Sequence, residues 1–204
     1  MKIALFGATG GTGRQVLEQA VRAGHQVTAL VREPAKLGQT PAGVTVVTGN
    51  VLQPTAVDQV VAGADAVICA LGNTSNNPDM MVTNGTRHII DAMQRLNVRR
   101  LIVVTSLGVG DSKDQVPFFF KALMKTVLRK AIEDKEAQET AVRASRLDWT
   151  IVRPGGLTDD PPTGMYQVGT AHLMAGRVAR ADVADFILKE LTRNEYIHQT
   201  PGIT

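Results

Sequence analysis

Met1-Lys-Ile-Ala-Leu-Phe-Gly-Ala-Thr-Gly-Gly-Thr-Gly-Arg14 is the stretch of this chain that decides its fold. The apolar residues from Ile3 to Phe6 have the length of a buried strand. Glycines then follow with the spacing G-x-x-G-x-x-G, at positions Gly7, Gly10 and Gly13. After Arg14 the apolar residues recur with a helical period. A strand, a glycine turn and a helix in this order are typical of a loop that binds the phosphates of a dinucleotide.

Each glycine of this loop has an expected task. Gly7 permits a tight turn, Gly10 lets the backbone approach a pyrophosphate, and Gly13 lets the helix pack close to the strand. The free N–H groups and the positive end of the helix would then face the phosphates. A glycine-rich turn that binds nothing is the alternative. The position of the motif between a strand pattern and a helix pattern favours the phosphate loop.

The composition predicts one globular core. The chain has 204 residues, of which 44% are hydrophobic and 20% are charged. The net charge is only +3, and the adjacent basic pairs Arg99-Arg100 and Arg129-Lys130 each lie beside a helix pattern. A nucleic-acid partner is therefore not expected. A mild positive balance does suit an anionic cofactor.

The single cysteine, Cys69, lies in the apolar run from Ala66 to Leu71 and is expected to be a buried strand residue. One cysteine allows no disulfide within the chain, which fits a reducing compartment. The N-terminal apolar run is too short for a secretory signal, and no apolar run has the length of a membrane span. The sequence therefore predicts a cytoplasmic protein without a membrane partner.

Strand and helix patterns alternate along the rest of the chain. Strands are expected at 26–31, 44–48, 64–71, 100–105 and 149–153, with a short one at 166–168. Helices are expected at 54–62, at 80–96, in a long segment that ends near 145, and at 181–192. This alternation predicts an α/β fold: a doubly wound Rossmann fold with a mainly parallel sheet, as a single domain over 1–204. Short substrate-side elements are expected from about residue 155, a site loop at 107–116, and a peripheral tail after Asn194.

The end of the second expected strand indicates which dinucleotide binds. Folds that prefer NAD place an acid here for the ribose, whereas this chain has Arg32, with Lys36 one helical turn further on. The planar fork of arginine can pair with a 2′-phosphate, so NADP(H) is favoured over NAD(H). Glu33 is the counter-evidence, because it could serve as the ribose acid in a shifted register.

Several motifs together resemble the atypical short-chain dehydrogenase/reductase group, and within it the biliverdin reductase B or NADPH-dependent flavin reductase type. The resemblance covers residues 1 to about 195. The motifs that carry it are Phe6-Gly-Ala-Thr-Gly-Gly-Thr-Gly13, Leu30-Val-Arg32, Gly49-Asn-Val51, Asp65-Ala-Val-Ile68, Leu71-Gly72, Val104-Thr-Ser106 and Pro161-Pro-Thr-Gly-Met-Tyr166. The first third of the chain is specific to the group, and the later motifs are less so.

The resemblance implies an NADP(H) site with four parts: the glycine loop, the cations for the 2′-phosphate, the adenine side and the nicotinamide side. In that order its residues would be Gly7, Thr9, Gly10, Gly11, Thr12 and Gly13; Arg32 and Lys36; Asn50 and Val51; and Leu71, Gly72, Asn73, Thr105, Ser106, Pro154 and Gly155. Ser106 would also orient the nicotinamide carboxamide or a bound water. Phe118, Phe119 and Tyr166 would line the pocket of the planar acceptor, and for the phenylalanines a core role is the alternative.

This chain departs from the group at three positions. Asn50 stands where the group usually has aspartate, and Gly155 where biliverdin reductase B has a histidine. The Tyr-x-x-x-Lys acid/base pair keeps only Lys135, since Ala131 replaces the tyrosine. Alcohol oxidation and sugar epimerisation by that route are therefore not expected. No metal site is expected either, because the histidines at 25, 88, 172 and 198 lack metal-ligand spacing.

Three functions remain compatible with these residues. The first is NADPH-dependent reduction of a flavin or a biliverdin. The second is reduction of a quinone on the same scaffold. The third is a regulator that senses NADP(H) without turnover, as in NmrA-like relatives. A monomer or a weak homo-oligomer is expected.

Overall fold

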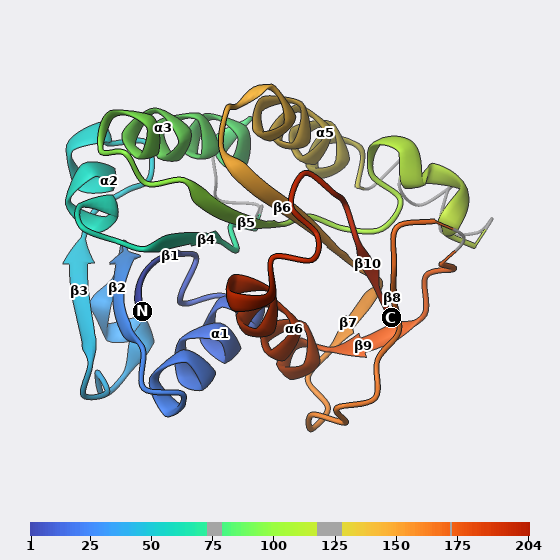
Figure 1. Ribbon diagram of the computed structural model, residues 1–204, viewed down its shortest axis with the longest axis horizontal. Helices are drawn as coiled ribbons and strands as arrows, with labels where there is room; N and C mark the ends of the chain where they lie inside the picture. Colours follow the sequence, from blue (N-terminus) through green and yellow to red (C-terminus); the bar gives the residue numbers. More distant parts are fainter. Residues whose placement is uncertain (73–78, 118–127, 172) are drawn as a thin grey trace.

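A mainly parallel sheet with helices on both faces forms the centre of the computed structural model, which describes residues 1–72, 79–117, 128–171 and 173–204 (Figure 1). The strand order is β3-β2-β1-β4-β5-β6-β10-β8. Its first six members are β1 (Lys2–Phe6), β2 (Gln26–Val31), β3 (Val44–Thr48), β4 (Ala66–Cys69), β5 (Arg100–Val104) and β6 (Asp148–Pro154), and all of them pair in parallel. This order confirms the doubly wound fold.

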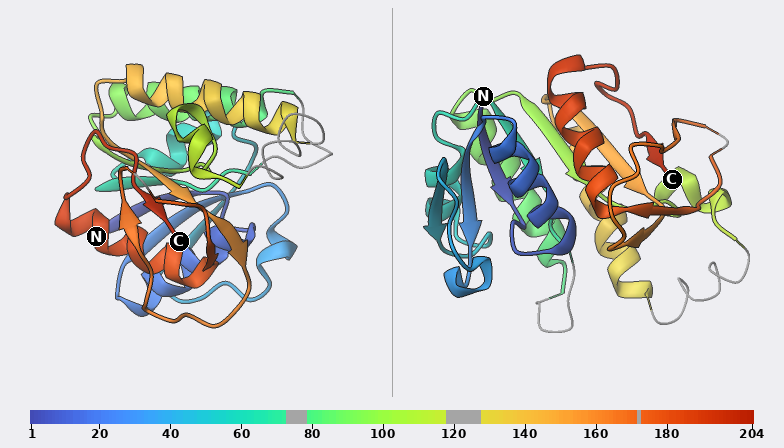
Figure 2. Two further views of the ribbon diagram at one scale, coloured as in Figure 1. Left: turned by 90° about the vertical axis from the view of Figure 1, so that its right-hand side faces the viewer. Right: turned by 90° about the horizontal axis from the view of Figure 1, so that it is seen from below.

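Helices cover the two faces of the sheet separately. α1 (Gly11–Arg22) and α6 (Arg180–Arg193) pack side by side on one face. The helices α2 (Pro54–Val61), α3 (Met81–Arg95) and α5 (Arg129–Ala144) pack on the other (Figures 1 and 2). Alternate strand residues therefore enter different cores: Phe6 packs under α2 and α3, and Leu5 under α1 and α6.

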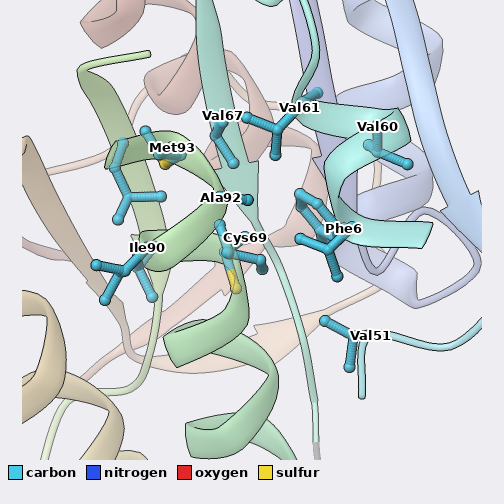
Figure 3. Packing of buried hydrophobic residues seen from close by; sticks show 14 of the residues in the cluster. Phe6, Val51, Val60, Val61, Val67, Cys69, Ile90, Ala92 and Met93 are labelled. Carbon is cyan, nitrogen blue, oxygen red and sulfur yellow. The ribbon is translucent and has the colours of Figure 1, made fainter. Parts of the chain in front are cut away.

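The core under α2 and α3 is apolar and tightly filled. Figure 3 shows Val60 of α2 and Met93 of α3 packed with Phe6 and Cys69 of the sheet. Each of these four side chains is at most 1% exposed. Cys69 is a buried strand residue, as expected, and burial raises the pKa of its thiol.

The chain after β6 differs from expectation. The tail is not peripheral: Gly202–Ile203 forms β10, which pairs in parallel with β6 and antiparallel with β8 (Val168–Gly169). The short strand expected at 166–168 thus lies two residues later. Two further strands, β7 (Gly156–Thr158) and β9 (Arg177–Ala179), form a separate parallel pair. Strands of two or three residues are too short for a periodic signal, so the sequence did not reveal them.

Two short 3-10 helices complete the described elements. η1 (Pro34–Leu37) follows β2, and η2 (Gly110–Gln115) lies within the segment that was expected to be a loop. Both follow strands at their carboxyl ends. The strand order reverses at β1, between β2 and β4, which is where open α/β sheets bind ligands. The expected cofactor residues Gly7, Arg32 and Thr105 directly follow the carboxyl ends of β1, β2 and β5.

Candidate active site

The glycine loop packs so closely that it has no room for a side chain at Gly7 or Gly13. Gly7 adopts a φ of +90°, which favours glycine. A β-carbon on Gly13 would lie 2.0 Å from the carbonyl oxygen of Gly7. The first bond within α1 runs from the Arg14 N–H to the Gly10 carbonyl, so the N–H groups of Gly11, Thr12 and Gly13 point out of the helix end. This end is built to hold an anion.

A cavity of about 290 Å³ lies between this loop and the carboxyl ends of β2, β3 and β4. It brings together nine of the predicted cofactor residues: Gly7, Thr9, Gly10, Arg32, Lys36, Asn50, Val51, Leu71 and Gly72. A larger hollow of about 460 Å³ lies at the amino ends of β1 and β2, far from the glycine loop. The smaller cavity is the candidate site, because ligands of open sheets bind at the carboxyl ends.

Two cations line the part of the cavity beyond β2. Arg32 and Lys36 both face it, and the Lys36 Nζ also pairs with the Glu33 carboxylate at 2.8 Å. The hydrogen bond from Lys36 lowers the pKa of Glu33. Arg14 donates a hydrogen bond to the Lys36 carbonyl at 2.6 Å and so ties η1 to α1. Arg14 directly follows the glycine motif, but the motif gives this position no role, so the contact has no signal in the sequence.

The adenine side is shaped by Asn50 and Val51. Asn50 Oδ1 accepts a hydrogen bond from the Leu52 N–H at 3.0 Å. An aspartate would accept the same bond, which explains why asparagine can replace the usual acid here. Val51 is buried, and a β-carbon on Gly85 of α3 would lie 2.6 Å from its Cγ1. Gly85 therefore gives Val51 the room to form this wall.

Lys135 holds two strand ends together. Its ammonium group donates to the Leu71 carbonyl at 2.9 Å, the Val104 carbonyl at 2.8 Å and Gln138 Oε1 at 3.2 Å. These bonds use all three of its hydrogens. Burial lowers the pKa of Lys135 from 10.5 to about 8. The lysine that resembled half of an acid/base pair therefore fixes the spacing of β4 and β5 at the site.

The hydroxyl groups after β5 have protein partners. Thr105 donates to Glu139 at 2.8 Å, and Glu139 in turn pairs with Arg153, whose Nε lies 2.9 Å from Oε1. The Thr105 side chain is thus directed at α5, and its N–H donates to the Val152 carbonyl at 2.8 Å, so its backbone carbonyl is the group left for the predicted cofactor contact. Ser106 donates to the Leu107 carbonyl at 3.0 Å. Its orienting role stays a prediction and would require exchange of that bond.

Gly155 has no space for a side chain. A β-carbon here would lie 2.4 Å from the Gly176 carbonyl oxygen, and the Gly155 N–H bonds to the Ile203 carbonyl at 2.9 Å. Pro154 is buried beside it and accepts a bond from the Leu107 N–H at 2.8 Å. The histidine of biliverdin reductase B could not occupy this position unless the backbone at Gly176 moved.

Tyr166, which is expected to line the acceptor pocket, makes its contacts with α6. Its hydroxyl donates to Asp185 at 2.7 Å and its ring packs edge-on to Phe186, both on α6. Pairing with α6 places it in the other helical layer. Of the remaining expected residues, Asn73, Phe118 and Phe119 lie outside the described residues.

Within the described residues, no three His, Cys, Asp or Glu side chains lie close enough to share a metal ion. Over the same ranges, no helix has the combined length and apolar character of a membrane span.

Comparison with known proteins identifies the family. A profile described as NAD(P)H-binding matches residues 7–194. The chain belongs to the NAD(P)H-binding family. This membership confirms the expected cofactor class, and the glycine loop and cavity fit such a dinucleotide. It also agrees with the resemblance to the atypical short-chain dehydrogenase/reductase group.

Individual relatives span most of this chain. The structure of ChuY, an anaerobillin reductase from Escherichia coli O157:H7, has a TM-score of 0.82 and 30% identity, covering 100% of this chain and 96% of that one. The uncharacterised protein YwnB of Bacillus subtilis is 29% identical, covering 96% of this chain and 94% of its own length. The oxidoreductase stcQ of Emericella nidulans is 26% identical over 89% of this chain and 77% of its own. The chain thus has the fold of NAD(P)H-binding oxidoreductases.

Proposed function

We propose that this protein is an NADPH-dependent reductase that transfers hydride to a planar conjugated acceptor, a flavin or a biliverdin. The observation that carries the proposal is the 290 Å³ cavity, which joins the glycine loop to Arg32 and Lys36 at the switch point of the sheet. The similarity to ChuY, an anaerobillin reductase, supports the reductase class.

The cations beside β2 support NADPH over NADH. Arg32 and Lys36 line the cavity where a 2′-phosphate would extend from the adenosine ribose. Glu33, the possible ribose acid, is engaged with Lys36 at 2.8 Å. That pairing argues against the shifted register in which Glu33 would hold the ribose.

The acceptor class is inferred from which groups of the protein could donate a proton to the acceptor. The bound nicotinamide supplies the hydride, and the chain must position the acceptor and exclude competing reactions. Lys135 has its hydrogens committed and Ala131 carries no hydroxyl, so this pair cannot supply a proton. The reduction consumes one hydride and one proton, and a flavin ring nitrogen can take that proton from water. Ser106 would orient the carboxamide or a bound water.

A second hollow offers space for the acceptor. It measures about 410 Å³ and lies between η2 and the residues Thr170, Ala171 and Met174. Its lining includes the charged side chains of Asp111, Asp114 and Arg153 and the apolar side chain of Met174, so it offers both charged and apolar surface. A planar ring system with polar substituents fits such a lining.

A multi-acceptor assay tests the proposal. NADPH oxidation is followed at 340 nm with FMN, biliverdin and a simple quinone in parallel, and NADH serves as the control. Turnover with FMN or biliverdin is expected. Turnover with the quinone alone would mean that the acceptor is a quinone and not a flavin or a biliverdin. NADPH binding without turnover on all three would replace the reductase with a sensor of NADP(H).

The dinucleotide preference is tested by reversing one charge. Arg32→Glu should raise the NADPH KM at least tenfold and spare the NADH KM, because only NADPH carries the 2′-phosphate. Arg22→Glu is the matched control, since it makes the same charge change in the last turn of α1, away from the cavity. If the NADPH/NADH ratio is the same in both variants, Arg32 does not read the 2′-phosphate.

A further inference from the structure

Arg180 brings a cation to the glycine loop from the far end of the sequence. It is the first residue of α6, and α6 packs beside α1 (Figure 2). A β-carbon on Gly11 would lie 2.6 Å from both Cδ and Nε of Arg180. The arginine side chain therefore lies on the first residue of α1, where the N–H groups that face a dinucleotide begin.

Arg180 is held in place by one exposed acid. Its Nη1 pairs with Asp159 Oδ1 at 2.8 Å. The Arg180 side chain is 26% exposed, whereas that of Asp159 is 87% exposed. An ion pair with a largely solvated acid contributes little stability, so its guanidinium can exchange partners at small cost.

We propose that Arg180 is a pyrophosphate-binding residue and that Asp159 competes with the cofactor for it. The planar guanidinium matches phosphate oxygens, and the helix end beside it already favours an anion. When the dinucleotide binds, Arg180 exchanges Asp159 for a phosphate oxygen. Asp159, which follows β7, then loses its ion pair with α6. This inference rests on the NAD(P)H-binding family and not on the proposed acceptor.

Dinucleotide binding tests the inference without any turnover. The Kd values of NADPH and NADH are measured by fluorescence titration in the absence of acceptor. The pyrophosphate is common to both cofactors, so Arg180→Gln should weaken both by a similar factor, about tenfold. Adenosine 2′-monophosphate has no pyrophosphate, and its Kd should stay within about twofold. Arg32→Glu should instead weaken NADPH alone.

Variants at the competing acid should act in the opposite direction. Asp159→Asn removes the competitor and should tighten both dinucleotides about threefold. Asp160→Asn is the matched control, because it removes the same charge one position further along in an exposed residue. It should leave both Kd values unchanged, which separates a specific pair from a general charge effect.

Three results would overturn the inference. The first is an Arg180→Gln variant that melts within 2–3 °C of wild type and binds both dinucleotides normally. The second is an effect of that variant on NADPH alone. The third is equal behaviour of Asp159→Asn and Asp160→Asn. Arg180→Lys covers the case in which the glutamine variant does not fold, and it should give an intermediate loss. If the acceptor assay shows no turnover but these Kd shifts are present, the proposed reductase activity is refuted and the role of Arg180 at the pyrophosphate still stands.

Discussion

Two buried arginine–glutamate pairs lie at opposite ends of the sheet and have different surroundings. Arg100 starts β5 and pairs with Glu190 of α6 at 2.9 Å. Arg153 lies near the end of β6 and pairs with Glu139 of α5. Burial lowers the pKa of Arg100. Burial acts on Arg153 too, but its bonds to Glu139 and Asp111 outweigh it and raise the pKa.

The two pairs also differ in what they reach. Glu190 receives the N–H groups of Glu195 and Tyr196, which belong to the turn after α6. Glu139 receives the Thr105 hydroxyl at the candidate site. The Nε of Arg100 has no hydrogen-bond partner among the described residues. The Arg100 pair thus anchors a turn, whereas the Arg153 pair holds the end of β5 where the nicotinamide would lie.

The largest expected effect comes from removing an acid of these pairs. Glu190→Gln should lower the free energy of unfolding by about 3–5 kcal/mol, because it leaves the buried Arg100 guanidinium without its counter-charge. Glu139→Gln should lower it by less, because Asp111 still pairs with Arg153. Urea unfolding measures both. The two variants should differ in their effect on catalysis. At a temperature where both are folded, only Glu139→Gln should reduce kcat. Equal loss of kcat in the two variants would show that the Arg153 pair has no special link to the site.

The free energy of unfolding should also depend on pH through Lys135, which lies at the carboxyl ends of β4 and β5. The native pKa of Lys135 is about 8 and its reference value is 10.5. Between these values the unfolded chain binds more protons than the native one, so this lysine makes stability rise with pH, by up to about 1.4 kcal/mol per pH unit. Below pH 8 its contribution is constant. Lys135→Met should remove this rise.

Unfolding curves of both proteins at pH 7.5, 9 and 10 would measure the difference. The difference between wild type and variant cancels the titration of all other groups. A difference that stays constant across this range would contradict the lowered pKa of Lys135.

The smallest expected effect concerns the threonine beside each pair. Thr105→Val removes one bond to Glu139 and should cost about 1 kcal/mol of unfolding free energy. Thr150→Val should cost about 2 kcal/mol, because its hydroxyl accepts from Arg100 and donates to the Tyr196 carbonyl. Thermal unfolding gives both values. Only Thr105→Val should change kcat. A change of kcat in Thr150→Val alone would mean that the Arg100 pair, and not the Arg153 pair, supports the site.

The cofactor half of the fold could be predicted because its signals are local. The turn at Gly7, the packing at Gly13 and the cation at Arg32 lie within about thirty residues of one another and follow from periodicity and glycine chemistry. The same signals located the expected strands up to β6 within a few residues.

The other half depends on contacts between distant residues. Ile203 becomes a strand residue only because β6 offers an edge, and Tyr166 turns to α6 because Asp185 accepts its hydrogen bond. Arg180 lies on Gly11 through the packing of α6 on α1. None of these pairings has a signal in the neighbouring sequence, so pattern reading could not find them.

Lys135 sets a limit on redesign of this scaffold. A protein engineer who wanted alcohol chemistry could install a tyrosine at position 131 to complete the missing pair. That tyrosine would meet a lysine whose every hydrogen already serves Leu71, Val104 and Gln138. The exchange would gain a hydroxyl without the cation that activates it. New donors for the two strand-end carbonyls would have to come first.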